Sequence, residues 1–190
     1  MPTLTEVQKL DLWRAVRAKM DRWYANFARK CPATEPAGPI DCYCLLWAHF
    51  TAEELRELPG WERAQLQAGS AFHPVNTQAD DDGVTPNRYG YQFEWSPRMM
   101  FDVVQGIPPE WHCWAACPPT TIVDLTLPAF KRRAGLAGLK WTAPDPPIVY
   151  VCEGAELGWC VECRADPRAI KLAYALLGTL SGGPLVIQVH

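Results

Sequence analysis

The chain has 190 residues, a length typical of one domain, and its 48% hydrophobic and 21% charged residues give the balance of a globular protein. The formal net charge of −3 and an isoelectric point near 5.8 argue against a nucleic-acid partner, because nucleic-acid-binding domains usually carry a basic stripe. The basic run at Lys131, Arg132 and Arg133 is interpreted as a solvated loop or helix face. We expect a single domain over residues 1–190.

No membrane partner is expected, because no stretch approaches about 18 uncharged apolar residues. The N-terminal stretch MPTLTEVQKLDLWRAV contains acidic residues and lacks the apolar run of a secretory signal. Both features predict a cytoplasmic protein, in which cysteines are mostly reduced thiols. The eight cysteines are Cys31, Cys42, Cys44, Cys113, Cys117, Cys152, Cys160 and Cys163.

The first predicted element is a helix over residues 4–29, where apolar residues recur at helical intervals. Thr3 and Glu6 have the spacing of a capping box at its start. A proline-rich connector at 32–39 follows, and a second helix is expected to begin near Asp41.

A second capping box, from Thr51 to Glu54, predicts a break in that helix and a short helix that ends before Pro59. After residue 64 the pattern changes to strands, and the small residues at 68–71 predict a close approach by another element. Strands are expected at 64–75, 88–95, 111–117, 121–125, 146–154 and 159–163, with a short helix at 99–106.

Asp166 as N-cap and Pro167 at the first helical position predict a closing helix, which Gly178 would stop. The tail at 183–190 is a candidate edge strand. Helices first, a meandering antiparallel sheet next and a closing helix last predict an α+β fold.

Cys42 follows the connector and an aspartate, and it opens an apolar helix. A helix N-terminus favours a thiolate, and its free N–H groups can also receive an oxyanion. Cys44 lies about 200° further around the helix, so both thiols cannot face one cleft. We predict Cys42 as the nucleophile because it lies nearest the expected helix start, with Cys44 as the alternative. For either thiol, the competing interpretation is a small buried hydrophobe.

His112 and Asp124 lie on the two arms of the predicted hairpin. If the arms pair, the two residues fall roughly opposite each other on one face, with Cβ atoms about 5 Å apart. The carboxylate would then hold the imidazole in one tautomer and support the imidazolium formed when a thiol gives up its proton. Trp114 would share this face, shield the pair from water and contact substrate. The competing interpretations are a surface or core histidine and a turn carboxylate.

The order of a cysteine on an early helix, a histidine in H-x-W and an aspartate in I-V-D-L-T resembles the papain-like cysteine hydrolase superfamily, especially its transglutaminase-like branch. HCWAACPPTTIVDLT is similar to that branch's histidine strand and the strand ending in aspartate. AQLQAGSAF occupies the position of the sheet strand that follows the catalytic helix in that branch. DCYCLL resembles the Asp-Cys-x-x-Leu motif of the cell-wall amidase branch. The whole pattern is most similar to bacterial and phage-borne proteins with this cysteine–histidine–aspartate order.

This resemblance implies Cys42 as nucleophile, His112 as general acid/base and Asp124 as the orienting carboxylate. The implied reaction is acyl transfer through a thioester on a peptide, a protein or a small amide, without a cofactor. Peptidase, amidase, deamidase and transferase activities all fit.

The resemblance also implies a papain-like or transglutaminase-like α+β fold, with N-terminal helices packed on an antiparallel sheet. The N-terminal helix would occupy residues 1–30 and the catalytic core residues 38–130. Residues 131–190 would add the closing strands and helix.

A structural zinc site is the main rival from another class of function. Cys160 and Cys163 have the C-x₂-C spacing, and Cys113 with Cys117 or Cys152 would complete four ligands. A catalytically inactive peptide-binding module of the same fold is a third possibility, since nine tryptophans suit a peptide groove.

Two other patterns are given no role in a site. Asp80, Asp81 and Asp82 lack the ligand spacing of an EF-hand, so we expect a solvated loop there. His49, one helical turn past Leu45, is expected to be packed or exposed.

Overall fold

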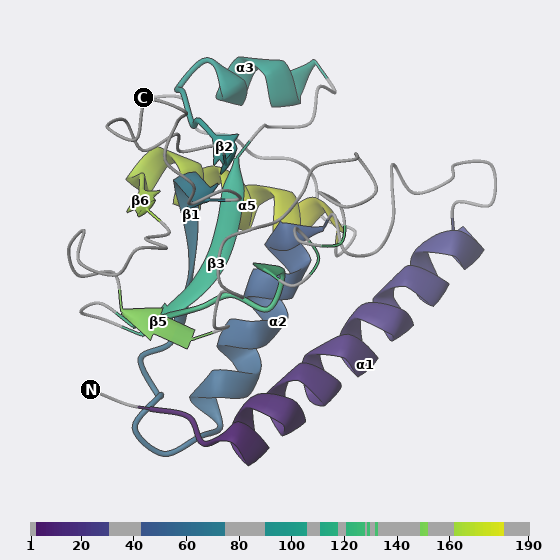
Figure 1. The fold of residues 1–190 in the computed structure, drawn as a ribbon. Helices are drawn as coiled ribbons and strands as arrows, with labels where there is room; N and C mark the ends of the chain where they lie inside the picture. The colour runs from purple at the N-terminus through teal and green to yellow at the C-terminus, as the bar shows by residue number, and fades with distance from the viewer. Residues whose placement is uncertain are drawn as a thin grey trace, which may run out of the picture.

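The computed structural model describes residues 3–30, 43–74, 90–105, 111–117, 121–127, 129, 132, 149–151 and 162–180. These residues form an α+β fold, as the element order predicted, with one six-stranded antiparallel sheet (Figure 1). The helices are α1 (Glu6–Lys30), α2 (Cys44–Arg56), α3 (Met99–Val104) and α5 (Pro167–Leu180). The strands are β1 (Gln65–Pro74), β2 (Gly90–Phe93), β3 (His112–Cys117), β4 (Thr121–Val123), β5 (Val149–Val151) and β6 (Glu162–Ala165).

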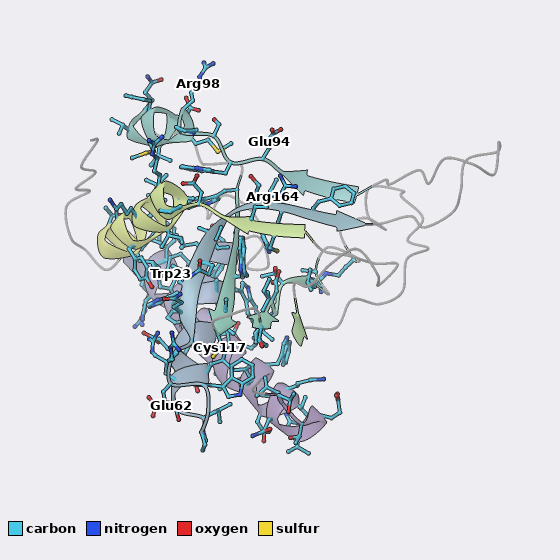
Figure 2. The ribbon with its side chains drawn as sticks, turned by 90° about the vertical axis from the view of Figure 1, so that its left-hand side faces the viewer. Trp23, Glu62, Glu94, Arg98, Cys117 and Arg164 are labelled. Atoms are coloured by element: carbon cyan, nitrogen blue, oxygen red, sulfur yellow. The ribbon has the colours of Figure 1, made fainter. Side chains whose placement is uncertain are left out.

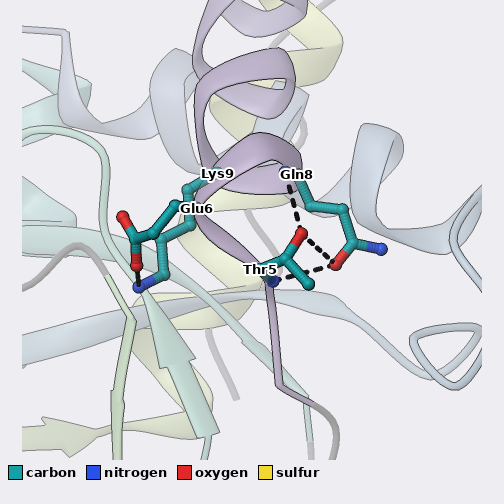
Figure 3. A network of polar contacts seen from close by, with 4 residues as sticks. All are labelled: Thr5, Glu6, Gln8 and Lys9. Carbon is teal, nitrogen blue, oxygen red and sulfur yellow. Dashed lines mark hydrogen bonds and ion pairs between the residues drawn. The ribbon is translucent and has the colours of Figure 1, made fainter.

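Helix α1 begins with a capping box two residues later than predicted. The Gln8 N–H donates to Thr5 Oγ1 at 3.2 Å, and the Thr5 N–H donates to Gln8 Oε1 at 2.9 Å (Figure 3). Thr5 is therefore the N-cap and Gln8 the third helical residue, a reciprocal pair that satisfies two N–H donors. The sequence carries the same spacing twice, and the helix uses Thr5 with Gln8 rather than Thr3 with Glu6.

Helix α2 begins at Cys44, later than the predicted start near Asp41, and it runs unbroken to Arg56. The predicted break at Thr51 is wrong. Thr51 is a buried residue of the helix interior, on the face that also buries Trp47 and Leu55. Continuing the helix buries this stripe against the sheet, which outweighs the local capping signal.

Strand β1 pairs with three other strands along its two edges. Gly69 pairs with His112 of β3 and also with Ala165 of β6. Two residues further on, Ala71 pairs with β2 and with β6. Because a strand residue has one neighbour on each side, β6 follows one edge of β1, and β3 and β2 follow each other along the opposite edge. The end of β2 therefore lies next to the start of β3.

Gly69 is the point of close approach that the small residues predicted. A Cβ at this position would lie 2.1 Å from the carbonyl oxygen of Arg164 on β6. Only glycine gives the two backbones this separation.

The predicted hairpin between residues 111–117 and 121–125 is present as the antiparallel pair β3–β4. Ala115 pairs with Val123 and Cys117 with Thr121. Continuing this register by one residue puts Asp124 opposite Trp114, so Asp124 and His112 are diagonal neighbours on one face rather than directly opposed.

Helices α2 and α5 pack on the same face of the sheet, and α1 packs on α2 from outside (Figure 1). The core between these layers contains Trp47 and Leu55 of α2, Leu66 of β1 and Leu172 of α5. On β3 the odd-numbered residues, such as Cys113, face this core, and the even-numbered residues, such as His112, belong to the opposite face.

Helix α5 has the predicted N-cap, because Asp166 Oδ1 accepts hydrogen bonds from the N–H groups of Arg168 and Ala169. Gly178 does not stop the helix, which continues to Leu180. The candidate strand at 183–190 and the connector at 32–39 lie outside the described residues. No helix in the described part of the chain has both the length and the apolar character needed to cross a membrane.

Candidate functional site

His112 and Asp124 form a hydrogen-bonded pair that is closed off from solvent. The His112 Nε2–H donates to Asp124 Oδ2 at 2.6 Å. His112 is 0% exposed and Asp124 is 2% exposed. The structure thus brings together the two residues predicted from the hairpin, through the short charge-assisted contact expected of an imidazolium and a carboxylate.

The second oxygen of Asp124 is occupied by Thr126. The Thr126 N–H donates to Asp124 Oδ1 at 2.9 Å, and the Thr126 Oγ1–H donates to the same oxygen at 2.6 Å. The chain turns directly after β4, which returns Thr126 to the carboxylate two residues before it. Both carboxylate oxygens are satisfied inside the protein, so the carboxylate is held in one orientation.

Cys44 is the first residue of α2, and its thiol contacts the start of β3. His112 and Cys113 both lie near enough to lower the pKa of this thiol. Because His112 uses Nε2 for Asp124, Nδ1 is the ring nitrogen that remains for proton exchange with a thiol. Sγ also lies 4.0 Å from the Trp111 carbonyl oxygen, the outer limit for a sulfur hydrogen bond.

The charges of this cluster favour an ion pair. The hydrogen bond from Cys113 lowers the pKa of Cys44, burial raises it, and the hydrogen bond and positive charge of His112 lower it further, to well below the ordinary thiol value. Burial lowers the pKa of His112, but the charge and hydrogen bond of Asp124, with the contact to Cys44, raise it to about 10. Both shifts favour the thiolate of Cys44 and the imidazolium of His112.

Cys113 remains a thiol beside this ion pair. Burial raises its pKa, as do its hydrogen bond to Cys44 and the negative charges of Cys44 and Asp124, to well above the ordinary value. The two opposite shifts favour Cys113 as the thiol and Cys44 as the thiolate.

Two aromatic rings lie against His112. The Phe93 ring stacks at a centroid distance of 5.2 Å, and the Trp114 ring at 6.1 Å. Phe93 reaches His112 because β2 and β3 follow each other along one edge of β1. Trp114 is 3% exposed, in keeping with a role in shielding the pair from water. Its contact with substrate stays a prediction.

Cys42 lies outside the described residues, so its prediction as nucleophile is not tested. The criterion behind that prediction, a thiol at the helix start, applies to Cys44, because α2 begins there. His49 contacts Glu53 instead of this cluster: its Nε2 lies 3.2 Å from a carboxylate oxygen of Glu53.

Sequence reasoning missed three residues of the site: Phe93, Cys113 and Thr126. The pattern Asp-x-Thr directly after a strand was the available signal for Thr126, since a threonine there can donate back to the aspartate. Phe93 had no local signal, because its contact depends on the placement of β2 along β1.

The described cysteines of the predicted zinc site, Cys113, Cys117 and Cys163, lie apart on the sheet. Cys117 lies at the far end of β3 from His112, near Glu62 (Figure 2). Cys163 lies on β6, on the other edge of β1 from β3. Cys152 and Cys160 lie outside the described residues, as do Asp80, Asp81 and Asp82. Among the residues that the structure describes, no group of three or more His, Cys, Asp or Glu side chains could hold a metal ion.

Searches for similar proteins found no matching family model, no matching curated protein and no matching solved structure.

Proposed function

We propose that the protein is a cysteine-dependent acyl-transfer hydrolase of the peptidase or amidase type. In this proposal Cys44 is the nucleophile, His112 the general acid and base, and Asp124 the carboxylate that orients His112. The buried His112–Asp124 hydrogen bond carries the proposal, together with the Cys44 thiol at the start of α2, whose pKa His112 lowers. A helix-borne cysteine followed by a strand histidine and then an aspartate supports a papain-like or transglutaminase-like arrangement.

The reaction follows from the charges of the site. The Cys44 thiolate attacks the carbonyl carbon of an amide or ester and forms a C–S bond. As the tetrahedral intermediate collapses, the leaving group takes the Nδ1 proton of His112, and a thioester remains. Neutral His112 then takes a proton from the water or amine that attacks the thioester, and the thiolate is released. Asp124 keeps the ring oriented and stabilises its charged form.

The start of α2 offers the groups that such a reaction needs for its oxyanion. The N-cap residue Tyr43 makes no side-chain capping hydrogen bond. The N–H groups of Leu46 and Trp47 already donate to the Tyr43 carbonyl. The N–H groups of Cys44 and Leu45 therefore point out of the first turn, where the helix dipole also favours negative charge.

Selective alkylation tests the reactive thiolate. An ordinary thiol is mostly protonated at about pH 6, so Cys44 should react with iodoacetamide there about ten- to a hundredfold faster than the other cysteines. Its rate should fall off at lower pH than the rates of the other cysteines, since thiolate is lost only as pH falls through the lowered pKa of Cys44. The imidazolium is lost as pH rises through about 10.

Chymotryptic mapping identifies the labelled residue, because cleavage after Tyr43 separates Cys42 from Cys44. Cys44→Ala should abolish the fast labelling, and the matched variant Cys42→Ala should retain it. Fast labelling on the Cys42 peptide would instead make Cys42 the nucleophile, and labelling at an ordinary rate everywhere would contradict the ion pair.

Acyl transfer itself is tested with p-nitrophenyl acetate. We expect a burst of about one p-nitrophenolate per chain and one acetyl group on Cys44, followed by slower release. An alkylation-reactive Cys44 that never acquires the acetyl group would support the inactive peptide-binding module in place of the hydrolase.

A further inference from the structure

Helix α1 carries a stripe of exposed apolar side chains near its N-terminus. Val7 is 69% exposed, Leu10 48% and Trp13 40%. Each follows the one before it by three residues, so the three side chains are neighbours on the helix surface. Another side of α1 is buried against the core at Val16, about 120° around the helix from Leu10. Figure 1 shows α1 along the outside of the helix layer.

Two opposite charges flank this stripe at equal distances from Leu10. Glu6 lies four residues before Leu10, and Arg14 lies four residues after it. Each is about 40° around the helix from Leu10 and about 6 Å from it along the axis, in opposite directions. Their side chains are 88% and 64% exposed. The stripe is therefore centred on Leu10, with a negative end and a positive end.

We propose that two copies of this chain associate through this stripe, with their α1 helices antiparallel and Leu10 against Leu10 of the second copy. The two-fold axis between the leucines brings Val7 level with Trp13 of the second copy. It also brings Glu6 level with Arg14 of the second copy, at both ends of the contact. Each copy thus uses the same surface, as a closed dimer requires. The contact includes no residue of the proposed acyl transfer, so the two proposals are tested separately.

The charges favour a second copy in this orientation. Antiparallel pairing puts opposite charges together at both ends and also opposes the two helix dipoles. Parallel pairing would put Glu6 beside Glu6 and Arg14 beside Arg14, where like charges repel. Within one helix Glu6 contacts Lys9 and Arg14 contacts Asp11. Such exposed ion pairs contribute little free energy, so these side chains can take a partner across the contact.

The association should be weak, because the stripe offers few apolar side chains. Interfaces that bury less than about 1,200 Å² are typical of transient complexes. We expect a dissociation constant between about 10 µM and about 1 mM. At about 1 µM the chain is then almost entirely monomeric, so unfolding measured at that concentration describes the monomer.

Sedimentation equilibrium of the 190-residue chain from about 10 µM to about 2 mM tests the association. We expect the average mass to rise with concentration from 21.3 kDa toward twice that value. A mass of 21.3 kDa at every concentration would overturn the proposal. A mass that rises past the dimer would also overturn it, because a two-fold contact closes after two copies.

Leu10→Asp tests the centre of the contact, because it puts two carboxylates beside the two-fold axis. We expect association to weaken about tenfold or more. Tyr174→Asp is the matched control, since Tyr174 is 49% exposed on α5 and lies outside the stripe. It should associate like the wild type. Circular dichroism checks that each variant keeps its helices. Association of Leu10→Asp as tight as that of the wild type would rule out this contact.

Exchange of the two charges tests the orientation and does not depend on the leucine. Glu6→Arg and Arg14→Glu each put like charges at both ends of the antiparallel contact. Each should weaken association about five- to thirtyfold. The double variant with both changes restores opposite charges and should associate about as tightly as the wild type. A double variant as weak as the single variants would show that the antiparallel pairing is wrong.

Discussion

Asp124 has separate partners on its two carboxylate oxygens, and this fixes the direction in which His112 points. Oδ2 accepts from His112 Nε2, and Oδ1 accepts from the backbone and the hydroxyl of Thr126. Rotation of the carboxylate would break buried hydrogen bonds on both sides, each costly to leave unmade. The His112 ring is thereby held in one orientation, with Nε2 on Asp124.

Thr126→Val tests this orientation, because valine keeps the shape of threonine and removes only the hydroxyl donor. We expect a loss of about 1–3 kcal/mol in the free energy of unfolding, since a buried carboxylate oxygen loses one of its donors. Slower alkylation of Cys44 at about pH 6 should accompany it. Denaturant unfolding and alkylation rates measure the two effects.

Thr126→Ser is the matched control for that variant, since serine can still donate to Asp124. It should restore the alkylation rate and its pH dependence. If Thr126→Val alkylates like the wild type at every pH, Thr126 contributes to stability alone and does not position His112.

At the scale of the elements, β1 organises the sheet, because β6 follows one edge while β3 and β2 share the other. This brings Phe93 at the end of β2 against His112 at the start of β3. Gly69, opposite His112, is also the position where the Arg164 carbonyl oxygen of β6 leaves no room for a Cβ on β1.

Gly69→Ala should separate β1 and β6, because the new Cβ would lie 2.1 Å from the Arg164 carbonyl oxygen. We expect a loss of about 1–3 kcal/mol in the free energy of unfolding, typical of overpacking. Gly178→Ala is the matched control, because nothing lies within 4 Å of its added Cβ. Within α5 it should gain about 0.5–1 kcal/mol, since alanine favours a helix over glycine. Equal thermal midpoints for the two variants would contradict the close approach.

At the scale of the whole molecule, α1 belongs to the same core as the sheet and α2. Its Leu12, Val16 and Met20 are buried in that core. On its partly exposed side, Lys19 Nζ lies 2.9 Å from Glu53 Oε2 and 2.8 Å from Glu54 Oε1 of α2. We expect α1 to unfold together with the site.

Met20→Ala tests that coupling, because Met20 is 0% exposed. Its free energy of unfolding should fall by about 2–5 kcal/mol, the range for large-to-small core substitutions. The midpoints followed by tryptophan fluorescence and by alkylation of buried Cys117 should shift together. Leu10→Ala, at a position 48% exposed on the same helix, should change stability by less than about 0.5 kcal/mol. A shift of the unfolding midpoint in only one of the two probes would show that α1 and the sheet unfold independently.

The amino-acid sequence by itself determined the α+β layout, because period-two and helical spacings of apolar residues are local properties of the chain. It also determined the His112–Asp124 pair: a hairpin closed by a short turn puts both residues on one face whatever surrounds it. The Asp166 cap of α5 is equally local.

Only the tertiary structure decided which thiol the described site contains and which residues support it. A helix turns about 100° per residue, so a start at Cys44 instead of near Asp41 changes the side chain that meets β3. The contacts of Phe93 and Cys113 join segments far apart in the chain, and the continuity of α2 through Thr51 depends on what that residue is buried against. Such contacts come from packing between elements, and the spacing of residues within one element does not predict them.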